Sequence, residues 1–398
     1  MSTEAKQITI ESVGADGTML QTPSQATSSS RLVFADHLRA ALTILVVLHH
    51  LAVIYGANAL FYYLEPPKND RLASLVLLVF VLMNQAYFMG FFFLLSGYFT
   101  PGSFDHKGSA SFFKDRLLRF GIPLVVFMLV LGPIASIGLY YWTGITTPFI
   151  QLYPNLIGVG PLWFVEMLLL FDFGYVIWRY NRPSVQASAQ PLEHVFRPPS
   201  YLAVGLFILA LALASYAMRM VVPMGVSIPF FGFPTLSYLP QYLSFFILGV
   251  IAFRRNWFQT IPSSLGRTGF VVAGLSTIVL FPFALSGGTA FAFLGHGTFQ
   301  SAVYALWDST FSVGMCLALT TFFRRFLNRQ SRFGRFLSQQ AFTVYIIHIP
   351  IIVLLALAIR GIHLESLLKF GLAALIGVPL CFALAFLVRK IPFASRVL

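Results

Sequence analysis

Two adjacent histidines lie inside an apolar run, ILVVLHHLAV at residues 44–53. A polar side chain in apolar surroundings costs about 1–3 kcal/mol unless it is hydrogen-bonded. For a single histidine, the ordinary explanation is a core residue bonded to a neighbouring helix. The alternative is proton transfer, because a neutral imidazole can act as a general base near neutral pH.

An arginine eleven residues before the second histidine favours the catalytic explanation. Eleven residues make about three helical turns, so Arg39 and His50 share one helix face, ~16 Å apart along the axis. His49 lies ~100° around the same helix and points elsewhere. Asp36 precedes Arg39 by three residues and can pair with it on the same face. Ionisable groups inside a membrane helix usually mark a functional interior.

Two later apolar segments each carry a further candidate for catalysis. Glu166 lies one helical turn after Trp163 in GPLWFVEMLLLF, and His348 lies one turn after Tyr345 in FTVYIIHIP. A second interior histidine and an interior carboxylate could both assist proton transfer. A lone tryptophan at a membrane boundary, however, ordinarily belongs to the aromatic belt.

The residues that could bind an anion lie in and after the second apolar segment. Arg116 and Arg119 are one turn apart on one helix face, and Lys107 is close by in the sequence. Arginine pairs bidentately with phosphate, so the two could clamp a phosphorylated ligand. The ordinary alternative is snorkelling at the membrane surface. Ser96 and Gly97 either mediate close helix packing or let a ligand approach the backbone.

The composition excludes an ordinary soluble protein. Only 10% of the 398 residues are charged and 58% are hydrophobic, whereas soluble domains carry roughly 25% charged residues. The net charge of +13 does not indicate a nucleic-acid partner, because the basic residues cluster between long apolar segments and form no single patch. Cys316 and Cys381 both lie inside apolar runs, which predicts neither a disulfide framework nor a metal site.

The elements that must position these residues are ten apolar segments, each near the ~20 residues that a membrane-spanning helix needs. They lie at 37–57, 72–98, 117–142, 161–180, 200–220, 236–253, 268–286, 299–323, 339–359 and 367–388. The weakest predictions are 236–253, which contains Pro240, and 299–323, which contains Asp308. The predicted fold class is an all-α, polytopic membrane protein with about ten transmembrane helices.

Loop charges predict the orientation of these spans. With the loops assigned alternately to two sides, 21 of the 26 Lys and Arg residues fall on the N-terminal side and 5 on the other. Positively charged loops stay cytoplasmic, so both termini are predicted to be cytoplasmic. We expect a disordered cytoplasmic tail at 1–30, a membrane domain at 31–390 and a short cytoplasmic tail at 391–398.

At these residues the sequence resembles the family-three membrane acyltransferases, multi-pass enzymes that acylate exported carbohydrates. The similarity covers roughly residues 31–390 and rests on five short motifs in order. They are Arg39 with His50, Phe92-Phe93 with Ser96-Gly97, Arg116 and Arg119 ahead of Ile122-Pro123, Trp163 with Glu166, and Tyr345 and His348 with Pro350. The stretch HKGSASFFKDRLLRFGIP is most similar to the branch related to glucan-modifying succinyltransferases.

The resemblance implies an integral acyltransferase of the plasma membrane, which is the inner membrane in a bacterium. Its donor would be cytoplasmic acyl-CoA of acetyl or succinyl type, its acceptor a hydroxyl of an extracytoplasmic carbohydrate or glycan, and no metal is implied. The catalytic candidates are His50, Arg39, Glu166 and His348, and the donor-binding candidates are Arg116, Arg119, Ser96, Gly97 and Lys107. Because no serine nucleophile elbow is found, direct histidine-assisted transfer is preferred to an acyl-enzyme.

A proton-coupled transporter or flippase is the main alternative, because interior histidines and aspartates would also suit such a protein. Carriers often contain repeats and paired broken spans, and neither is clear in this sequence. Transport would also not require Arg39 together with Arg116 and Arg119. A non-catalytic scaffold fits least, given the cost of so many interior polar groups.

The charge count makes a testable prediction about topology. Residues 143–160 and 287–298 should face the outside of the cell, and 104–116 and 324–335 the cytoplasm. A single cysteine at position 329 of a cysteine-free variant should therefore stay unlabelled when intact cells meet a membrane-impermeant maleimide, and one at position 145 should react. Labelling of position 329 from outside would overturn the orientation.

Overall fold

The computed structural model describes residues 32–56, 59–65, 70–181, 197–226, 236–287 and 291–398. In these ranges the secondary structure is helical and contains no strand. Ten helices or helix series are long and apolar enough to cross a membrane, which confirms the predicted all-α fold and the number of spans. The tail predicted at 1–30 lies outside the described residues.

The ten spans follow one another along the chain. They are α1 (Val33–Tyr55), α2 (Arg71–Lys107), the α3–α6 series (Ser109–Thr143), the α7–α8 series (Phe149–Tyr180), α9 (Tyr201–Val221), η4 with α10 (Leu236–Arg254), α12 (Ser263–Leu285), α13 (Phe299–Phe326), α14 (Arg332–Ala358) and α15 (Ser366–Val388). Two short helices, α11 (Trp257–Thr260) and α16 (Ala394–Val397), lie outside the spans.

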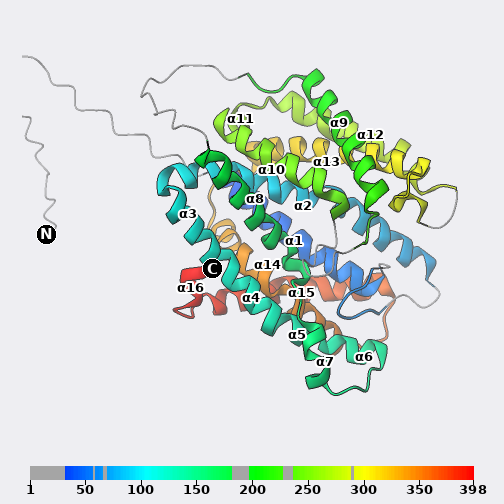
Figure 1. The fold of residues 1–398 in the computed structure, drawn as a ribbon. Helices are drawn as coiled ribbons and strands as arrows, with labels where there is room; N and C mark the ends of the chain where they lie inside the picture. Colours follow the sequence, from blue (N-terminus) through cyan, green and yellow to red (C-terminus); the bar gives the residue numbers. More distant parts are fainter. Residues whose placement is uncertain (1–31, 57–58, 66–69, 182–196, 227–235, 288–290) are drawn as a thin grey trace, which may run out of the picture. The chain divides into compact units, whose positions relative to one another are not determined.

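Helix α1 is the central element of the bundle. It packs against α2, α13, α14 and α15, and in Figure 1 it lies between α2 and α14. α1 and α14 are the most buried spans, whereas α9, α12 and α15 expose most of their apolar side chains. A helix with apolar residues on all sides suits a lipid environment, so the exposed faces are those expected to meet the bilayer.

The third span is kinked twice. It runs as α3 (Ser109–Arg116), η1 (Leu117–Gly121), α4 (Ile122–Val126), η2 (Phe127–Leu131), α5 (Gly132–Ala135) and α6 (Ile137–Thr143), in which η1 and η2 are π-turns. Each π-turn ends two residues before a proline, Pro123 or Pro133. Proline has no N–H to donate to the preceding turn, so the helix widens there. The span predicted at 117–142 is present, but it begins at Ser109.

Helix α2 continues beyond its predicted end at residue 98. Its 37 residues make a rod of ~55 Å, much longer than the ~30 Å hydrocarbon core. Asp70 caps the start by accepting a hydrogen bond from the Ala73 N–H at 2.9 Å, and Pro101 is accommodated near the other end. The last turns carry Asp105 and Lys107 and bring them beside α3 and α8.

The two weakest predicted spans are both present, each for an identifiable reason. Pro240 lies in the first turn of α10, where its missing N–H has no partner to lose. Asp308 in α13 pairs with Arg219 of α9 at 2.6 Å, and both side chains are fully buried. Arg219 and Lys369 are two of the five Lys and Arg residues on the less charged side, and both are buried in the structure, so neither is a loop charge. Without these two residues the side opposite the N-terminus has fewer loop Lys and Arg, so the charge difference between the two sides increases.

Small residues set the distance between α2 and α10. A Cβ at Gly97 would lie 2.1 Å from the Phe246 carbonyl oxygen, and one at Gly249 would lie 2.2 Å from the Leu94 carbonyl oxygen. The two glycines therefore let the backbones approach face to face, which is the packing expected of small residues in membrane helices. Of the two explanations open for Gly97, the structure supports helix packing.

Gly97→Ala should therefore destabilise the protein, because its methyl group would strike backbone that cannot rotate away. We expect a lower melting temperature in detergent and a lower yield of monodisperse protein. Gly274→Ala in α12 is the matched control, because a Cβ there meets nothing within 4 Å. Equal stability of the two variants would contradict the close packing of α2 on α10.

Candidate functional site

The two histidines predicted to act in catalysis meet between α1 and α14. The Nδ1 atom of His50 lies 3.1 Å from Nε2 of His348, and the ring centroids are 5.0 Å apart. His348 is fully buried, whereas His50 is partly exposed. Residues 298 positions apart in the sequence thus form one polar site in the most buried part of the bundle.

Backbone carbonyls assign the protons on both rings. Nδ1 of His348 lies 2.8 Å from the Tyr345 carbonyl oxygen, and Nδ1 of His50 lies 3.0 Å from that of Val46. A carbonyl oxygen only accepts, so in the neutral pair each Nδ1 carries the proton and donates it. Nε2 of His348 then shares the single His50 N–H with the Val46 carbonyl oxygen, as a three-centre hydrogen bond. Nε2 of His50 has no hydrogen-bond partner among the described residues, so its lone pair can accept a proton.

His49 faces α2, as its position ~100° around the helix predicts, although its ring lies edge-on to that of His50 with centroids 5.3 Å apart. Its ring stacks on Phe88 of α2 with centroids 4.9 Å apart and planes 29° apart, and the side chain is buried. Its Nδ1 has no hydrogen-bond partner among the described residues. The contact with the neighbouring helix is therefore aromatic stacking instead of the expected hydrogen bond.

Tyr345 connects the histidine pair to the start of α8. Its hydroxyl donates a hydrogen bond to the Pro161 carbonyl oxygen, and its ring packs against Phe92 and Phe164. The same residue supplies the carbonyl that holds His348. This contact fixes the position of α14 against the fourth span, and with it the orientation of the His348 ring.

Glu166 lies in the first turn of α8 (Trp163–Tyr180) and is half-buried. Its Oε2 atom is enclosed and has no hydrogen-bond partner in the described part of the chain, so the structure does not join it to either histidine. Trp163, one turn earlier, is buried with its ring 5.4 Å from that of Tyr242. It is thus an interior packing residue and does not belong to a surface belt.

Arg39 lies near the opposite end of α1 from His50. The helix is continuous from Val33 to Tyr55, so the predicted separation of ~16 Å along one face holds. Arg39 forms the expected ion pair with Asp36, and its guanidinium carbon lies 5.3 Å from the centroid of the Phe99 ring. The side chain remains 42% exposed, which leaves its outer nitrogens accessible.

A cluster of cations surrounds this end of α1. The exposed Arg119 lies within electrostatic range of three other guanidinium groups, those of Arg39, Arg116 and Arg389, and of one carboxylate, Asp115. We call these four arginines the arginine cluster. Like charges held this close repel one another, so an anion bound among them would relieve that repulsion.

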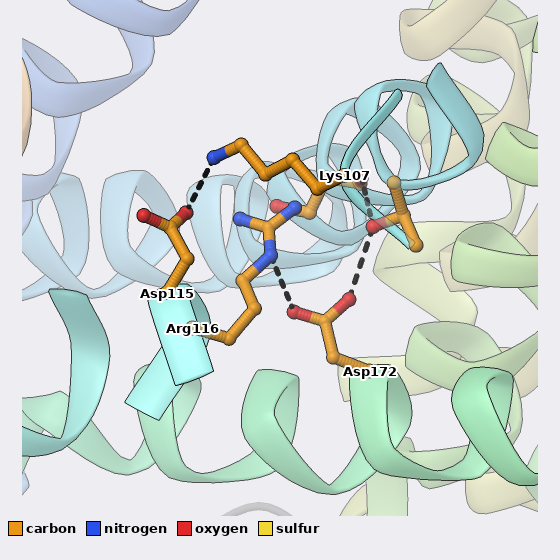
Figure 2. A network of polar contacts seen from close by, with 6 residues as sticks. Lys107, Asp115, Arg116 and Asp172 are labelled. Atoms are coloured by element: carbon orange, nitrogen blue, oxygen red, sulfur yellow. Dashed lines mark hydrogen bonds and ion pairs between the residues drawn. The ribbon is translucent and has the colours of Figure 1, made fainter. Parts of the chain in front are cut away.

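Arg116 is held within the cluster by an interior carboxylate. Its Nε lies 3.2 Å from Asp172, whose side chain is fully buried and also accepts a hydrogen bond from the Thr100 hydroxyl at 3.0 Å. Figure 2 shows the two terminal guanidinium nitrogens pointing away from Asp172. The rings of Phe112 and Phe120 lie 4.9 and 5.2 Å from the guanidinium carbon. These contacts orient the fork, and 14% of the Arg116 side chain is exposed.

The remaining donor-site candidates have more ordinary contacts. Lys107 pairs with Asp115 at 2.9 Å, and both side chains are exposed. Ser96 accepts a hydrogen bond from Thr100 with its carbonyl oxygen, which connects it to the Asp172 contacts drawn in Figure 2. Gly97 packs on α10 as described above. Lys107 and Gly97 are therefore engaged within the protein, whereas the contact of Ser96 involves only its backbone carbonyl.

Two residues outside the predicted set touch the site. Asp172 holds Arg116, and a carboxylate in an apolar segment is a signal that could have identified it. Phe61 stacks on His50 with centroids 5.2 Å apart and planes 19° apart, and a loop phenylalanine carries no such signal. A separate apolar cavity of about 230 Å³ among α2, α9, α10, α11 and α13 has none of the predicted site residues in its lining.

The Arg116–Asp172 pair makes a prediction about stability. Arg116→Gln should lower the melting temperature, because the buried Asp172 carboxylate would lose its partner. Adding Asp172→Asn should restore most of the loss, a coupling of about 0.5–3 kcal/mol in a double-mutant cycle. Arg119→Gln is the control and should change stability little, because that side chain is exposed. Independent, additive effects of the two substitutions would refute the pairing.

Comparison with known proteins identifies the family to which the chain belongs. A family model described as "Acyltransferase domain" matches residues 32–388. The chain is 25% identical over 335 residues to "Glucans biosynthesis protein C" of Escherichia coli O17:K52:H18 (strain UMN026 / ExPEC) and to that of Shigella dysenteriae serotype 1 (strain Sd197). Each match covers 81% of this chain and 82% of the relative. The Escherichia coli K12 protein of the same name is 24% identical over the same shares.

No solved structure matches. The chain belongs to the acyltransferase-domain family and is a multi-pass membrane acyltransferase.

Proposed function

We propose that the protein transfers an acyl group of acetyl or succinyl type from cytoplasmic acyl-CoA to a hydroxyl of an extracytoplasmic glucan. The observation that carries the proposal is the His50–His348 pair, held in the bundle interior with one imidazole lone pair free. The glucan acceptor is supported by the name of the curated relatives, "Glucans biosynthesis protein C".

His50 acts as the general base in this proposal. Its Nε2 accepts the proton of the acceptor hydroxyl while the hydroxyl oxygen forms a bond to the thioester carbonyl carbon. The carbon–sulfur bond then breaks, and the CoA sulfur takes the proton back from His50. No group outside the two substrates and the imidazole is needed to balance this step.

His348 is a positioning residue that acts through His50. Its Nε2 accepts the His50 Nδ1–H, and its own Nδ1–H is tied to the Tyr345 carbonyl oxygen. When His50 takes up a proton at Nε2, the Nδ1–H becomes a stronger donor and the contact with His348 stabilises the cation. In this arrangement a second group orients the base, and that group is a neutral imidazole instead of a carboxylate.

The arginine cluster is the proposed site for the CoA phosphates. Arg116 presents a fork that Asp172 orients, and Arg39 and Arg119 supply exposed guanidinium groups beside it. Arginine is suited to phosphate because its fork binds two oxygens at once. The pantetheine arm of the donor would then extend along α1 by ~16 Å, the distance from Arg39 to His50, and bring the thioester to His50.

The acceptor would approach from the opposite end of the site. Glu166 has an enclosed oxygen without a hydrogen-bond partner among the described residues, and such an oxygen can accept a hydrogen bond from a sugar hydroxyl. We place the enzyme in the plasma membrane with both termini cytoplasmic, as the 21-to-5 distribution of Lys and Arg supports.

Purified protein in detergent, given acyl-CoA and glucan oligosaccharides, tests the proposal directly. We expect release of CoA only when the acceptor is present, together with an acylated glucan detected by mass spectrometry. Absence of acceptor-dependent CoA release with acetyl-CoA and succinyl-CoA would contradict the proposed donor. Uptake of substrate into liposomes without CoA release would instead indicate a transporter.

The histidine variants give the sharper test of mechanism. His50→Ala should lower the rate of transfer by roughly 100- to 10,000-fold with acyl-CoA binding retained, since general-base loss has that size. His49→Ala should keep its activity per folded molecule and lose stability, because it removes the stack on Phe88.

His348→Ala should cause a partial loss of activity, and His348→Gln should recover part of it because the amide oxygen can still accept the His50 N–H. All variants are compared at matched amounts of folded protein. Full activity of His50→Ala together with an inactive His49→Ala would invert the assignment.

A further inference from the structure

Residues 59–65, which we call the 59–65 loop, close the histidine site at the end away from Arg39. The loop follows the C-terminal end of α1, and the Glu65 N–H donates a hydrogen bond to the Ile54 carbonyl oxygen at 2.8 Å. Phe61 reaches back from the loop and stacks on His50, nearly parallel to the imidazole. The loop thus contributes a side chain to the site that the mechanism has not yet used.

An ion pair anchors the loop to α15. The Glu65 carboxylate bonds to the Lys369 ammonium group, whose side chain is 3% exposed. Lys369 also donates to the Arg360 carbonyl oxygen at 3.1 Å, and the Tyr63 hydroxyl donates to Glu65 at 3.3 Å. A buried ammonium that lost its carboxylate would be strongly unfavourable, so this contact holds the loop in place.

The loop also fits closely against the third and fourth spans. A Cβ at Gly160 would lie 2.4 Å from the Tyr62 hydroxyl oxygen, and a Cβ at Gly138 would lie 2.5 Å from the Tyr62 carbonyl oxygen. Tyr63 is buried, whereas Leu60 is 90% exposed. The loop therefore fits between neighbouring elements, with Ala59 and Leu60 exposed and residues 61–65 buried or partly buried.

We propose that Phe61 is a positioning residue for the catalytic base, held on His50 by the 59–65 loop and its Glu65–Lys369 anchor. An imidazole has two soft side-chain torsions, and the Nδ1 contacts with Val46 and His348 fix one edge of the ring. The parallel stack of Phe61 fixes the plane of the ring. Together they set the direction in which the Nε2 lone pair points toward an acceptor hydroxyl.

The inference rests on the proposed function, because the direction of the Nε2 lone pair affects the reaction rate only if His50 is the general base. Misplacing a base by about 1 Å can cost ~100-fold in rate. Removing the stack should therefore act on the chemical step and on acceptor use. It should leave donor binding unchanged, since the arginine cluster lies at the other end of α1.

The first test is a kinetic series at position 61. Phe61→Ala should lower kcat by ~10- to 100-fold with the KM for acyl-CoA unchanged. Phe61→Trp should recover most of the rate, because a flat ring can still stack on His50. Leu60→Ala is the matched control on the same loop and should behave as wild type, since Leu60 is exposed. Equal rates for Phe61→Ala and wild type would refute the proposal.

A second measurement separates this inference from the proposed function. Diethyl pyrocarbonate modifies neutral imidazole nitrogens, and mass spectrometry of peptides reports each histidine separately. His50 should be modified faster in Phe61→Ala than in wild type, and the fully buried His348 should stay protected in both. Faster modification in a protein without transferase activity would uphold the packing and refute the function. Unchanged modification would refute the role of Phe61.

The anchor is tested by charge reversal. Glu65→Gln should reproduce part of the Phe61→Ala defect in kcat, because the Lys369 ammonium would lose its partner. The double variant Glu65→Lys with Lys369→Glu should recover activity relative to either single change. Failure of the reversal to recover activity, with the protein folded, would show that the ion pair does not set the loop position.

Discussion

The histidine site depends on how two imidazoles in the bundle interior satisfy their N–H groups by hydrogen bonding. Within their own helices the carbonyls of Val46 and Tyr345 lie within reach, and both Nδ1 atoms take them. These two hydrogen bonds determine which of the remaining nitrogens of the pair carry protons and which accept them. They make His348 an acceptor toward His50 and leave the second nitrogen of His50 without a proton, directed away from its partner. In the proposed mechanism this nitrogen is the base, and among the described residues neither ring is hydrogen-bonded to a carboxylate.

Several interior charges in the described part of the chain are likewise stabilised by a partner. Three ion pairs each join a span to a distant part of the chain: Arg116 with Asp172, Arg219 with Asp308, and Lys369 with Glu65. A charge without a partner in an apolar bundle is too costly to keep. The arginine cluster departs from this pattern, since Arg39 and Arg119 keep exposed guanidinium groups within range of other cations. The positive charge of the arginine cluster is therefore in excess, and a bound anionic donor would neutralise part of it.

Much of the architecture could be predicted from the sequence, because a membrane span is a local property of about 20 residues. The ten spans, the Asp36–Arg39 pair and the direction of His49 all follow from apolar length and helical periodicity. The π-turns of the third span are visible only as prolines whose effect depends on the surrounding helices. The contacts of His50 with His348 and Phe61 join distant or loop residues, and no local pattern encodes them. The predicted catalytic and donor-binding roles of all nine candidate residues stay predictions.

The central claim is the protonation pattern of the histidine pair, and nitrogen-15 NMR of protein with labelled histidine measures it directly. Comparison with His50→Gln and His348→Gln assigns the signals. The account predicts that, at neutral pH, each of the two residues shows a protonated, pyrrole-type Nδ1 and a bare, pyridine-type Nε2. A protonated Nε2 on His50 would contradict the account, because that nitrogen could then no longer take a proton from an acceptor hydroxyl.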